Sequence, residues 1–276
     1  MWATVVELVK YCDRWKHVEL ALPASMIFRL SSIRHRLPWL ESLHFNTQGT
    51  SGWPLAHRLS FFQYAPRLCR LSLPRGMPLP GLEMPWVQLT EFEGFFENIA
   101  RLQTLQLVLN LVKCTLHCDA WNSQFHSSVA HHVPKVHFPK LLFLRLNITG
   151  IPTDLFNHLE VPILHAIHIN AIGFIKHKPW ISGQFFVSFL SCCSDTLRSL
   201  SLKGPSNMNR YLDAIASPTP LKVVDFHGCV AGDILGRLVF PLPGAKSGSC
   251  LLPELEVLEL GSTTKNLQLL ADVIQS

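Results

Sequence analysis

The chain has 276 residues, of which 48% are hydrophobic and 16% are charged, and its formal net charge is +5. A composition this apolar excludes a largely disordered chain, and the length is ample for a large core. The basic residues are spread along the chain without a dense Lys/Arg run, which argues against nucleic-acid binding.

The sequence also lacks signals for export or membrane insertion. Residues 1–7 have no basic start, and Glu7 interrupts their apolar run, so they do not resemble a signal peptide. No segment reaches the roughly 18 consecutive apolar residues that a membrane span requires. The eight cysteines are irregularly spaced in a chain too long to need disulfide staples, which favours a reducing compartment. We therefore expect the protein in the cytoplasm or the nucleus.

A short pattern, Leu-x-x-Leu-x-Leu, recurs along the chain with variants. The first positions of its ten occurrences, used here as markers, are Trp15, Leu40, Leu68, Leu89, Leu111, Leu141, Leu164, Leu197, Leu221 and Leu255. Their spacing runs from 21 to 34 residues. The shorter intervals match the leucine-rich-repeat period of about 20–29 residues, and the longer ones imply insertions. Because side chains alternate along a strand, we expect the fourth and sixth positions to be buried and the third and fifth to face solvent.

Helices are predicted between these strands. The candidate helices cover residues 56–64, 98–109, 153–159, 184–193, 207–216 and 265–274, and Thr153 is a candidate N-cap. One choice of register matters, because residues 102–107 also fit the strand pattern. They begin only 13 residues after Leu89, and apolar positions 99, 102, 105 and 109 have helical spacing. We therefore place the strand after Leu111 and a helix before it.

A strand-plus-helix unit of this kind cannot bury its apolar side alone, so neighbouring units must stack to form the core. The predicted fold is α/β: a leucine-rich-repeat solenoid with a curved parallel sheet, outer helices and about ten irregular repeats. We expect a single domain over residues 1–276. Repeat arrays usually carry terminal caps, and neither end of this sequence shows one, so we expect the array to be uncapped or truncated at both ends.

Four segments carry a more specific similarity. Residues 8–20 have the pattern of a helix followed by a strand, Pro38-Trp39 precedes Leu40, and residues 85–90 and 110–116 fit the same style of unit. Together they resemble the leucine-rich-repeat portion of fungal F-box-type proteins. The resemblance implies that the repeats hold a protein substrate of a ubiquitin ligase, while an N-terminal F-box binds a Skp-type adaptor. The residues before Trp15 are too few to form an F-box, so adaptor binding is expected only if one lies upstream.

Metal and catalytic motifs receive little support. Enough donors for a zinc site lie within 24 residues, namely Cys114, His117, Cys118, His126, His131, His132 and His137. No C-x2-C pair accompanies them, and Cys114 occupies a core position, which favours a buried apolar cysteine. No G-x-S-x-G, H-E-x-x-H, P-loop or G-x-G-x-x-G motif occurs. We predict no enzymatic activity, no cofactor and no metal, with a metal-binding module at residues 114–137 as a weaker alternative.

The solvent-facing side of the strands is the predicted binding surface, because solenoids bind partners across their concave face. The fifth positions are Glu19, His44, Ser72, Glu93, Thr115, Arg145, His168, Ser201, Asp225 and Glu259. We expect a protein substrate to be bound by His44, Arg70, Lys113, Phe143, Arg145, His168 and Asp225.

Within this set, Lys113, Phe143, Arg145 and His168 are predicted to form a basic patch with an aromatic ring, and Arg and aromatic residues are enriched at interface hot spots. Asp225 and Glu259 would reverse the sign of charge toward the C-terminal end, which could orient a partner. The alternative is a degenerate structural repeat protein or fragment with no specific partner, whose strand face is ordinary solvated surface.

Overall fold

The structure is a computed structural model that describes residues 2–46, 59–77, 81–96, 102–118, 135–149, 155–171, 183–204, 220–227 and 254–260. Ten strands of these residues form one sheet in the order β1-β2-β3-β4-β5-β7-β9-β10-β11-β12, and β6 pairs separately with β8. Every strand pair with a defined register is parallel. The fold is therefore α/β with a long parallel sheet. The chain divides into two compact units, Met1–His117 and Cys118–Ser276.

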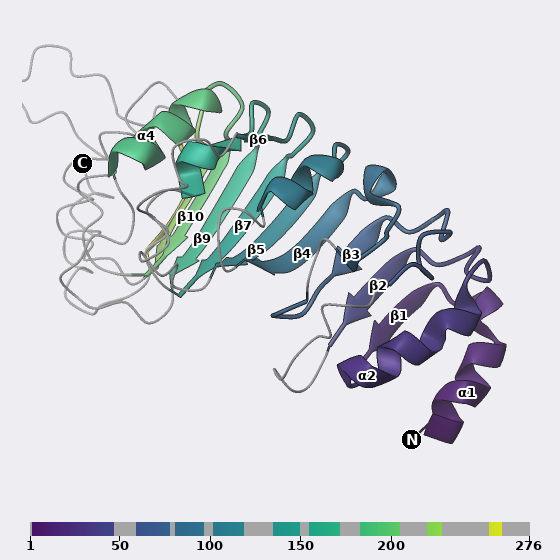
Figure 1. The fold of residues 1–276 in the computed structure, drawn as a ribbon. Coiled ribbons are helices and arrows are strands. Elements are labelled where there is room, and N and C mark those ends of the chain that lie inside the picture. Colours follow the sequence, from purple (N-terminus) through teal and green to yellow (C-terminus); the bar gives the residue numbers. More distant parts are fainter. Residues whose placement is uncertain are drawn as a thin grey trace, which may run out of the picture. The chain divides into compact units, whose positions relative to one another are not determined.

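The first unit supplies the first strands of the sheet. They are β1 (His17–Leu20), β2 (Ser42–Phe45), β3 (Arg70–Ser72), β4 (Glu91–Phe96) and β5 (Lys113–Cys118), whose last residue begins the second unit. Its helices are α1 (Trp2–Lys10), α2 (Ala24–Ile27) and the 3-10 helices η1 (Cys12–Arg14), η2 (Phe28–Ile33), η4 (Trp86–Gln88) and η5 (Gln103–Leu107). Figure 1 shows β1 to β4 side by side, with α1 and α2 beside β1. The helices contact one another, since η2 packs against both α1 and α2.

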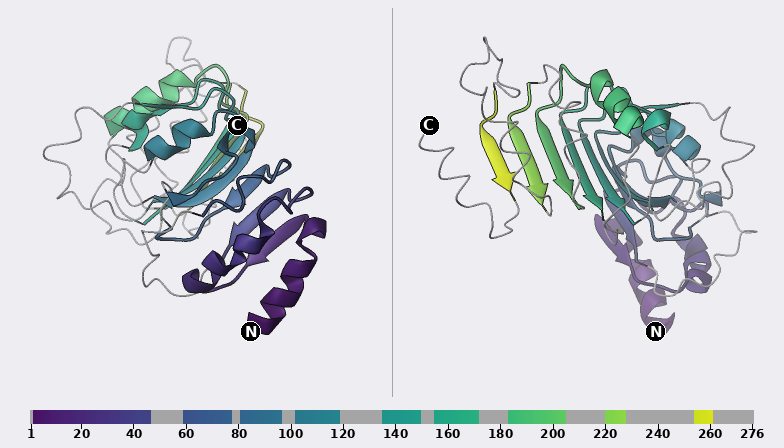
Figure 2. Two further views of the ribbon diagram at one scale, coloured as in Figure 1. Left: turned by 45° about the vertical axis from the view of Figure 1, so that its right-hand side comes forward. Right: turned by 90° about the vertical axis from the view of Figure 1, so that its left-hand side faces the viewer.

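The second unit continues with β6 (Val136–His137), β7 (Phe143–Ile148), β8 (Leu159–Glu160), β9 (Ala166–Ala171), β10 (Ser199–Lys203), β11 (Val223–His227) and β12 (Val257–Leu260). Its helices are η8 (Leu155–His158) and α4 (Gly183–Cys192). Figure 2 shows α4 on one side of these strands. Phe186 and Phe189 are three residues apart and so share a face of α4. Both pack edge-on against Phe156 of η8, with ring centroids 5.1 and 5.0 Å apart.

The strand positions predicted from the leucine pattern are confirmed. Each of the ten strands in the sheet begins two residues after a marker, from His17 after Trp15 to Val257 after Leu255. One backbone arrangement accompanies this spacing. The carbonyl of the residue after a marker accepts hydrogen bonds from the N–H groups of two successive residues in the next repeat. The acceptors are Lys16, Glu41, Cys69 and Thr90 in the first unit and Leu142, His165, Arg198 and Lys222 in the second.

Burial follows the predicted alternation. The markers from Leu40 to Leu221 are at most 1% exposed, and the fourth and sixth positions beneath the strands form the core, as with Leu144 and Leu146 of β7. Position Gly94 of β4 is an exception to the leucine pattern. An added Cβ there would lie 2.7 Å from Phe92 Cζ, so the Phe92 ring fills the volume that a sixth-position leucine would occupy. A larger residue two positions earlier thus compensates for the missing side chain.

The connections contain less α-helix than predicted. The helix predicted over 184–193 is confirmed as α4. The prediction for 56–64 is wrong over its described part, because residues 61–64 form turns, and Pro66 disfavours helical backbone just before it. Within 98–109 and 153–159 the structure has the 3-10 helices η5 and η8, which rise about 2.0 Å per residue against 1.5 Å in an α-helix and so span a connection with fewer residues.

Residues 207–216 and 265–274, as well as Thr153, lie outside the described residues. Among the helices that the structure does describe, none has the length and apolar character needed to cross a membrane.

Candidate functional site

The register of the strands aligns the predicted fifth positions into rows. In the first unit Glu19, His44, Ser72 and Glu93 are successive partners. In the second unit the row runs Arg145, His168, Ser201, Asp225 and Glu259, which we call the outer row. Of the seven predicted binding residues, His44, Arg70 and Lys113 belong to the first unit, and Phe143, Arg145, His168 and Asp225 to the second. The second unit therefore brings the larger set together.

Phe143, Arg145 and His168 form one contact group, which we call the Arg145 cluster. Phe143 and Arg145 are two residues apart on β7 and so point to the same side, and His168 is the register partner of Arg145 on β9. The Arg145 guanidinium lies 5.6 Å from the centroid of the Phe143 ring. The rings of Phe143 and His168 lie 4.9 Å apart with a tilt of 60°. An exposed cation is thus held over an aromatic face, a contact worth about 0.5–1 kcal/mol at exposed sites.

His168 is uncharged at neutral pH in this setting. Partial burial lowers the pKa of its imidazole, the Arg145 and Lys203 cations lower it further, and only the Asp225 carboxylate opposes them. The Arg145 charge lowers this pKa more than the Asp225 charge raises it, and Lys203 adds to the lowering. The outer row therefore carries positive character at its Arg145 end.

Asp225 differs from the solvent-facing residue that we predicted, because it is only 9% exposed. Ser201 Oγ donates a hydrogen bond to Asp225 Oδ2 at 2.8 Å, Lys203 Nζ lies 3.5 Å from the same oxygen, and His227 Nδ1 bonds the other oxygen, Oδ1. We call these four residues the Asp225 cluster. Burial acts to raise the pKa of the Asp225 carboxyl, but the Ser201 and His227 hydrogen bonds and the nearby positive charges outweigh it, so the pKa lies below its ordinary value.

The Asp225 cluster contains the residue types of a serine hydrolase triad in a different geometry. In a triad the serine hydroxyl bonds the histidine that will take its proton, and the carboxylate holds the other side of the ring. Here the Ser201 hydroxyl donates to the carboxylate instead, and Ser201 is 4% exposed. The arrangement therefore provides a buried, hydrogen-bonded carboxylate and lacks a nucleophile paired with a base.

Lys203 and His227 were not predicted as site residues. Both occupy the seventh position of their repeats, whereas the prediction used only the third and fifth positions. They are register partners on β10 and β11. The alternation of period two places this position on the same face as the third and fifth. Extending the same rule by two residues along each strand would have found them.

The first unit holds the other predicted residues in smaller groups. Arg70 Nε lies 3.2 Å from Glu91 Oε1 of the neighbouring strand. His44 is half-buried in β2, and Lys113 is exposed at the start of β5. A further pair was not predicted: His117 Nε2 lies 2.9 Å from Glu93 Oε1, and the His117 ring stacks on Phe95 with centroids 4.4 Å apart. Arg70 and Glu93 are therefore each paired with a side chain of a neighbouring strand.

Residues 114–137, the alternative metal site, are described only at their two ends. Cys114 and Cys118 are buried free thiols in β5, as expected for core cysteines. His137 Nδ1 lies 3.5 Å from Glu160 Oε2. The three other histidines, His126, His131 and His132, lie outside the described residues. Within the described part of the chain, no three His, Cys, Asp or Glu side chains gather closely enough to hold a metal ion.

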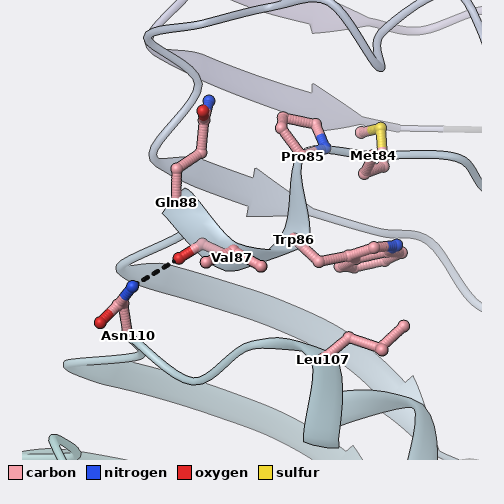
Figure 3. Close-up of a pocket in the computed structure, with 7 residues that line it drawn as sticks. All are labelled: Met84, Pro85, Trp86, Val87, Gln88, Leu107 and Asn110. Atoms are coloured by element: carbon pink, nitrogen blue, oxygen red, sulfur yellow. Dashed lines mark hydrogen bonds between the residues drawn. The ribbon is translucent and has the colours of Figure 1, made fainter.

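A surface pocket of about 500 Å³ lies in the first unit, beside η4 and the end of η5 (Figure 3). It is lined by Met84, Pro85, Trp86, Val87, Gln88, Leu107 and Asn110. Its two polar side chains bond the backbone: Asn110 Nδ2 donates to Val87 O at 2.7 Å, and Gln88 Nε2 donates to the carbonyls of Ala65 and Leu68. The lining contains no titratable group, so the pocket offers apolar surface and no acid–base or metal chemistry.

Comparison with known proteins adds no relative for this chain. Neither a scan against models of protein families nor a search of curated proteins found a match.

Proposed function

We propose that residues 1–276 form a leucine-rich-repeat solenoid of about ten irregular repeats that binds a protein partner across its concave face. This is the face of the sheet that carries the third and fifth positions, and we call it the outer face. The support for repeats is that each strand of the sheet starts two residues after a marker. A paired backbone hydrogen bond also recurs four times in each of the two compact units. In repeat proteins each unit makes the same contact with its neighbour. A chain in which the same contact follows eight of the ten markers fits that architecture.

The observation that carries the binding proposal is the Arg145 cluster. Arg145 is exposed, and its side chain is held against Phe143, which is only partly buried. Arginine and aromatic residues are enriched at protein interfaces and their hot spots, because they combine a large contact area with a polar or charged group. Asp225 would act differently from a direct contact. Its carboxylate is already bonded by Ser201 and His227, so it would hold Lys203 and His227 in place beside the binding residues.

In its most specific form, the proposal assigns these repeats to substrate recognition in an F-box-type ubiquitin ligase of the fungal kind. The support is the resemblance of residues 8–20, 38–40, 85–90 and 110–116 to that family. A Skp-type adaptor would bind only through an F-box encoded upstream of Met1. An in-frame F-box in the upstream transcript would support the assignment. A stop codon with no F-box after it would remove the ligase role and leave an interaction scaffold.

A peptide selection tests the binding surface directly. The purified chain is immobilised and used to select from a phage library of random peptides, and the selected peptides are measured against two double variants. The first, Phe143→Ala with Arg145→Ala, removes an aromatic and a cation from the outer face. The second, Val187→Ala with Lys140→Ala, removes an exposed apolar side chain and a cation from α4 and from the turn before β7.

We expect the selected peptides to lose binding to the first variant and to keep it with the second. Circular dichroism and thermal unfolding check that both variants are folded. Peptides that bind both variants equally, or a selection that yields no binding peptide, would refute the outer face as the binding surface.

The alternative, a structural repeat protein without a specific partner, is favoured by one observation. In the Asp225 cluster the four polar side chains bond one another through three contacts to Asp225, as they would on a surface maintained only for stability. The same selection separates the two proposals, because a purely structural face yields no peptide whose binding depends on Phe143 and Arg145.

A further inference from the structure

We propose that the Arg145 cluster binds an Asp or Glu side chain in an acidic segment of the partner, with the carboxylate paired to the Arg145 guanidinium. This inference rests on the proposed function, because it names the chemistry of the partner at the same face.

Arg145 differs from three other cations in or beside the sheet in its acidic neighbours. Among the described residues, no carboxylate lies within ion-pair distance of its guanidinium. By contrast, Arg70 pairs with Glu91 at 3.2 Å, Lys203 with Asp225 at 3.5 Å and Lys222 with Glu256. The difference follows from register, since the residue opposite Arg70 is Glu91 and the residue opposite Arg145 is His168. A charge left without a local counterpart on an exposed face is available to a partner.

The Phe143 ring orients the guanidinium for such a partner. A guanidinium placed over an aromatic face can still donate through its N–H groups, and their fork matches the two oxygens of a carboxylate. Side-chain freedom is already reduced by the contact, so less entropy is lost on binding. Phe143 is itself held by the His168 ring at 4.9 Å. The cluster is therefore pre-organised before a partner arrives.

The surroundings of the cluster favour an anion over a cation. His168 lies between the Arg145 and Lys203 charges, and its imidazole is kept neutral by burial and by those cations. Asp225, the acid that acts on His168, has its own charge met by Ser201, Lys203 and His227. A carboxylate placed at Arg145 would meet a positive potential and a neutral ring that can donate an N–H. A cationic segment would meet repulsion.

A carboxylate fits this site better than a phosphate does. Sites for phosphorylated segments gather several arginines around a dianion. Arg145 is the single arginine at the third, fifth or seventh positions of β7, β9, β10, β11 and β12. Arg198, at the start of β10, donates instead to the carbonyls of Asp195 and Leu197. One guanidinium with one neutral histidine matches the single charge of an Asp or Glu side chain.

The experiment uses the peptides selected on the wild-type chain and a parallel selection on Arg145→Gln. We expect Asp and Glu to be enriched in the first set and not in the second. One selected peptide is then compared with its copy in which Glu and Asp are replaced by Gln and Asn. The wild-type chain should bind the amide copy at least tenfold more weakly, about 1.4 kcal/mol, and Arg145→Gln should bind the two peptides equally. Lys140→Gln, which removes a cation from the same unit, should keep the full difference.

The outcomes separate this inference from the proposed function. Peptides that depend on Phe143 and Arg145 but carry no acidic enrichment would overturn the acidic partner and leave the binding face standing. A selection without any face-dependent peptide would overturn both. A phosphoserine copy that binds more than tenfold tighter than the Glu peptide would overturn the carboxylate in favour of a phosphorylated segment.

Discussion

Replacing Asp225 by alanine tests whether the Asp225 cluster stabilises the second unit. The change removes the acceptor of the Ser201 hydroxyl, and Ser201 is 4% exposed. A buried hydroxyl left without its partner costs about 1–3 kcal/mol, and a hydrogen bond to a charged group contributes about 1.5–3 kcal/mol. The bonds from Lys203 and His227 add less, because those side chains are 48% and 45% exposed and solvent screens them. We expect a loss of about 2–3 kcal/mol in the free energy of unfolding.

The measurement is urea denaturation followed by circular dichroism, with Glu259→Ala as the matched control. Glu259 is the exposed neighbour of Asp225 in the outer row, and its replacement should change the free energy of unfolding by no more than about 0.5 kcal/mol. Ser201→Ala and the double variant Ser201→Ala with Asp225→Ala complete a cycle. The two side chains are in contact, so we expect a coupling energy of about 1 kcal/mol.

The effect should also depend on pH in a defined direction. The pKa of Asp225 in the folded chain lies below its ordinary value of 3.8, so the folded state holds the ionised carboxylate more strongly than the unfolded state does. Its stabilisation is therefore fully present above pH 3.8 and is lost as the pH falls through the folded pKa. The difference between wild type and Asp225→Ala should shrink in acid. A loss below about 1 kcal/mol at neutral pH, or a difference that does not shrink in acid, would refute the buried, bonded carboxylate.

Two further changes probe packing and protonation. Gly94→Ala should lower the free energy of unfolding by about 1–3 kcal/mol through overpacking, because the new Cβ meets the Phe92 ring. Chemical denaturation should show a smaller loss in a Phe92→Leu background, where the side chain leaves room. An equal loss in both backgrounds would contradict the contact. His168→Gln should reduce the loss of stability that the wild-type chain shows in mild acid. Burial and the Arg145 charge lower the folded pKa of His168 below 6.5, so the wild-type chain loses stability as the pH falls from 6.5 toward that pKa. Thermal unfolding across this range measures the effect, and parallel curves for the two chains would count against it.

The strand positions and the buried face could both be predicted from the leucine pattern. Both follow from local rules: alternation with a period of two assigns Leu144 and Leu146 to the core, and the marker Leu141 predicts where β7 starts. The same rule predicts which residues share the outer face, because parallel strands in register keep equivalent positions on one side. The strand position and the buried face of a repeat depend on its own residues, so they can be predicted without reference to the neighbouring repeats.

The pairing of the outer-face residues and the fold of the connections depend on contacts between strands, which the sequence pattern does not specify. Among the described residues Arg70 meets an acid and Arg145 does not, because a neighbouring strand places Glu91 opposite Arg70 and His168 opposite Arg145. Asp225 is buried because Ser201 on the adjacent strand and His227 on its own strand both close over its carboxylate. Pairing energies of this kind arise between strands far apart in sequence, and burial is a property of the assembled sheet. A local pattern therefore predicts the face on which a side chain lies, while the assembled neighbours decide its charge state, its partner and its exposure.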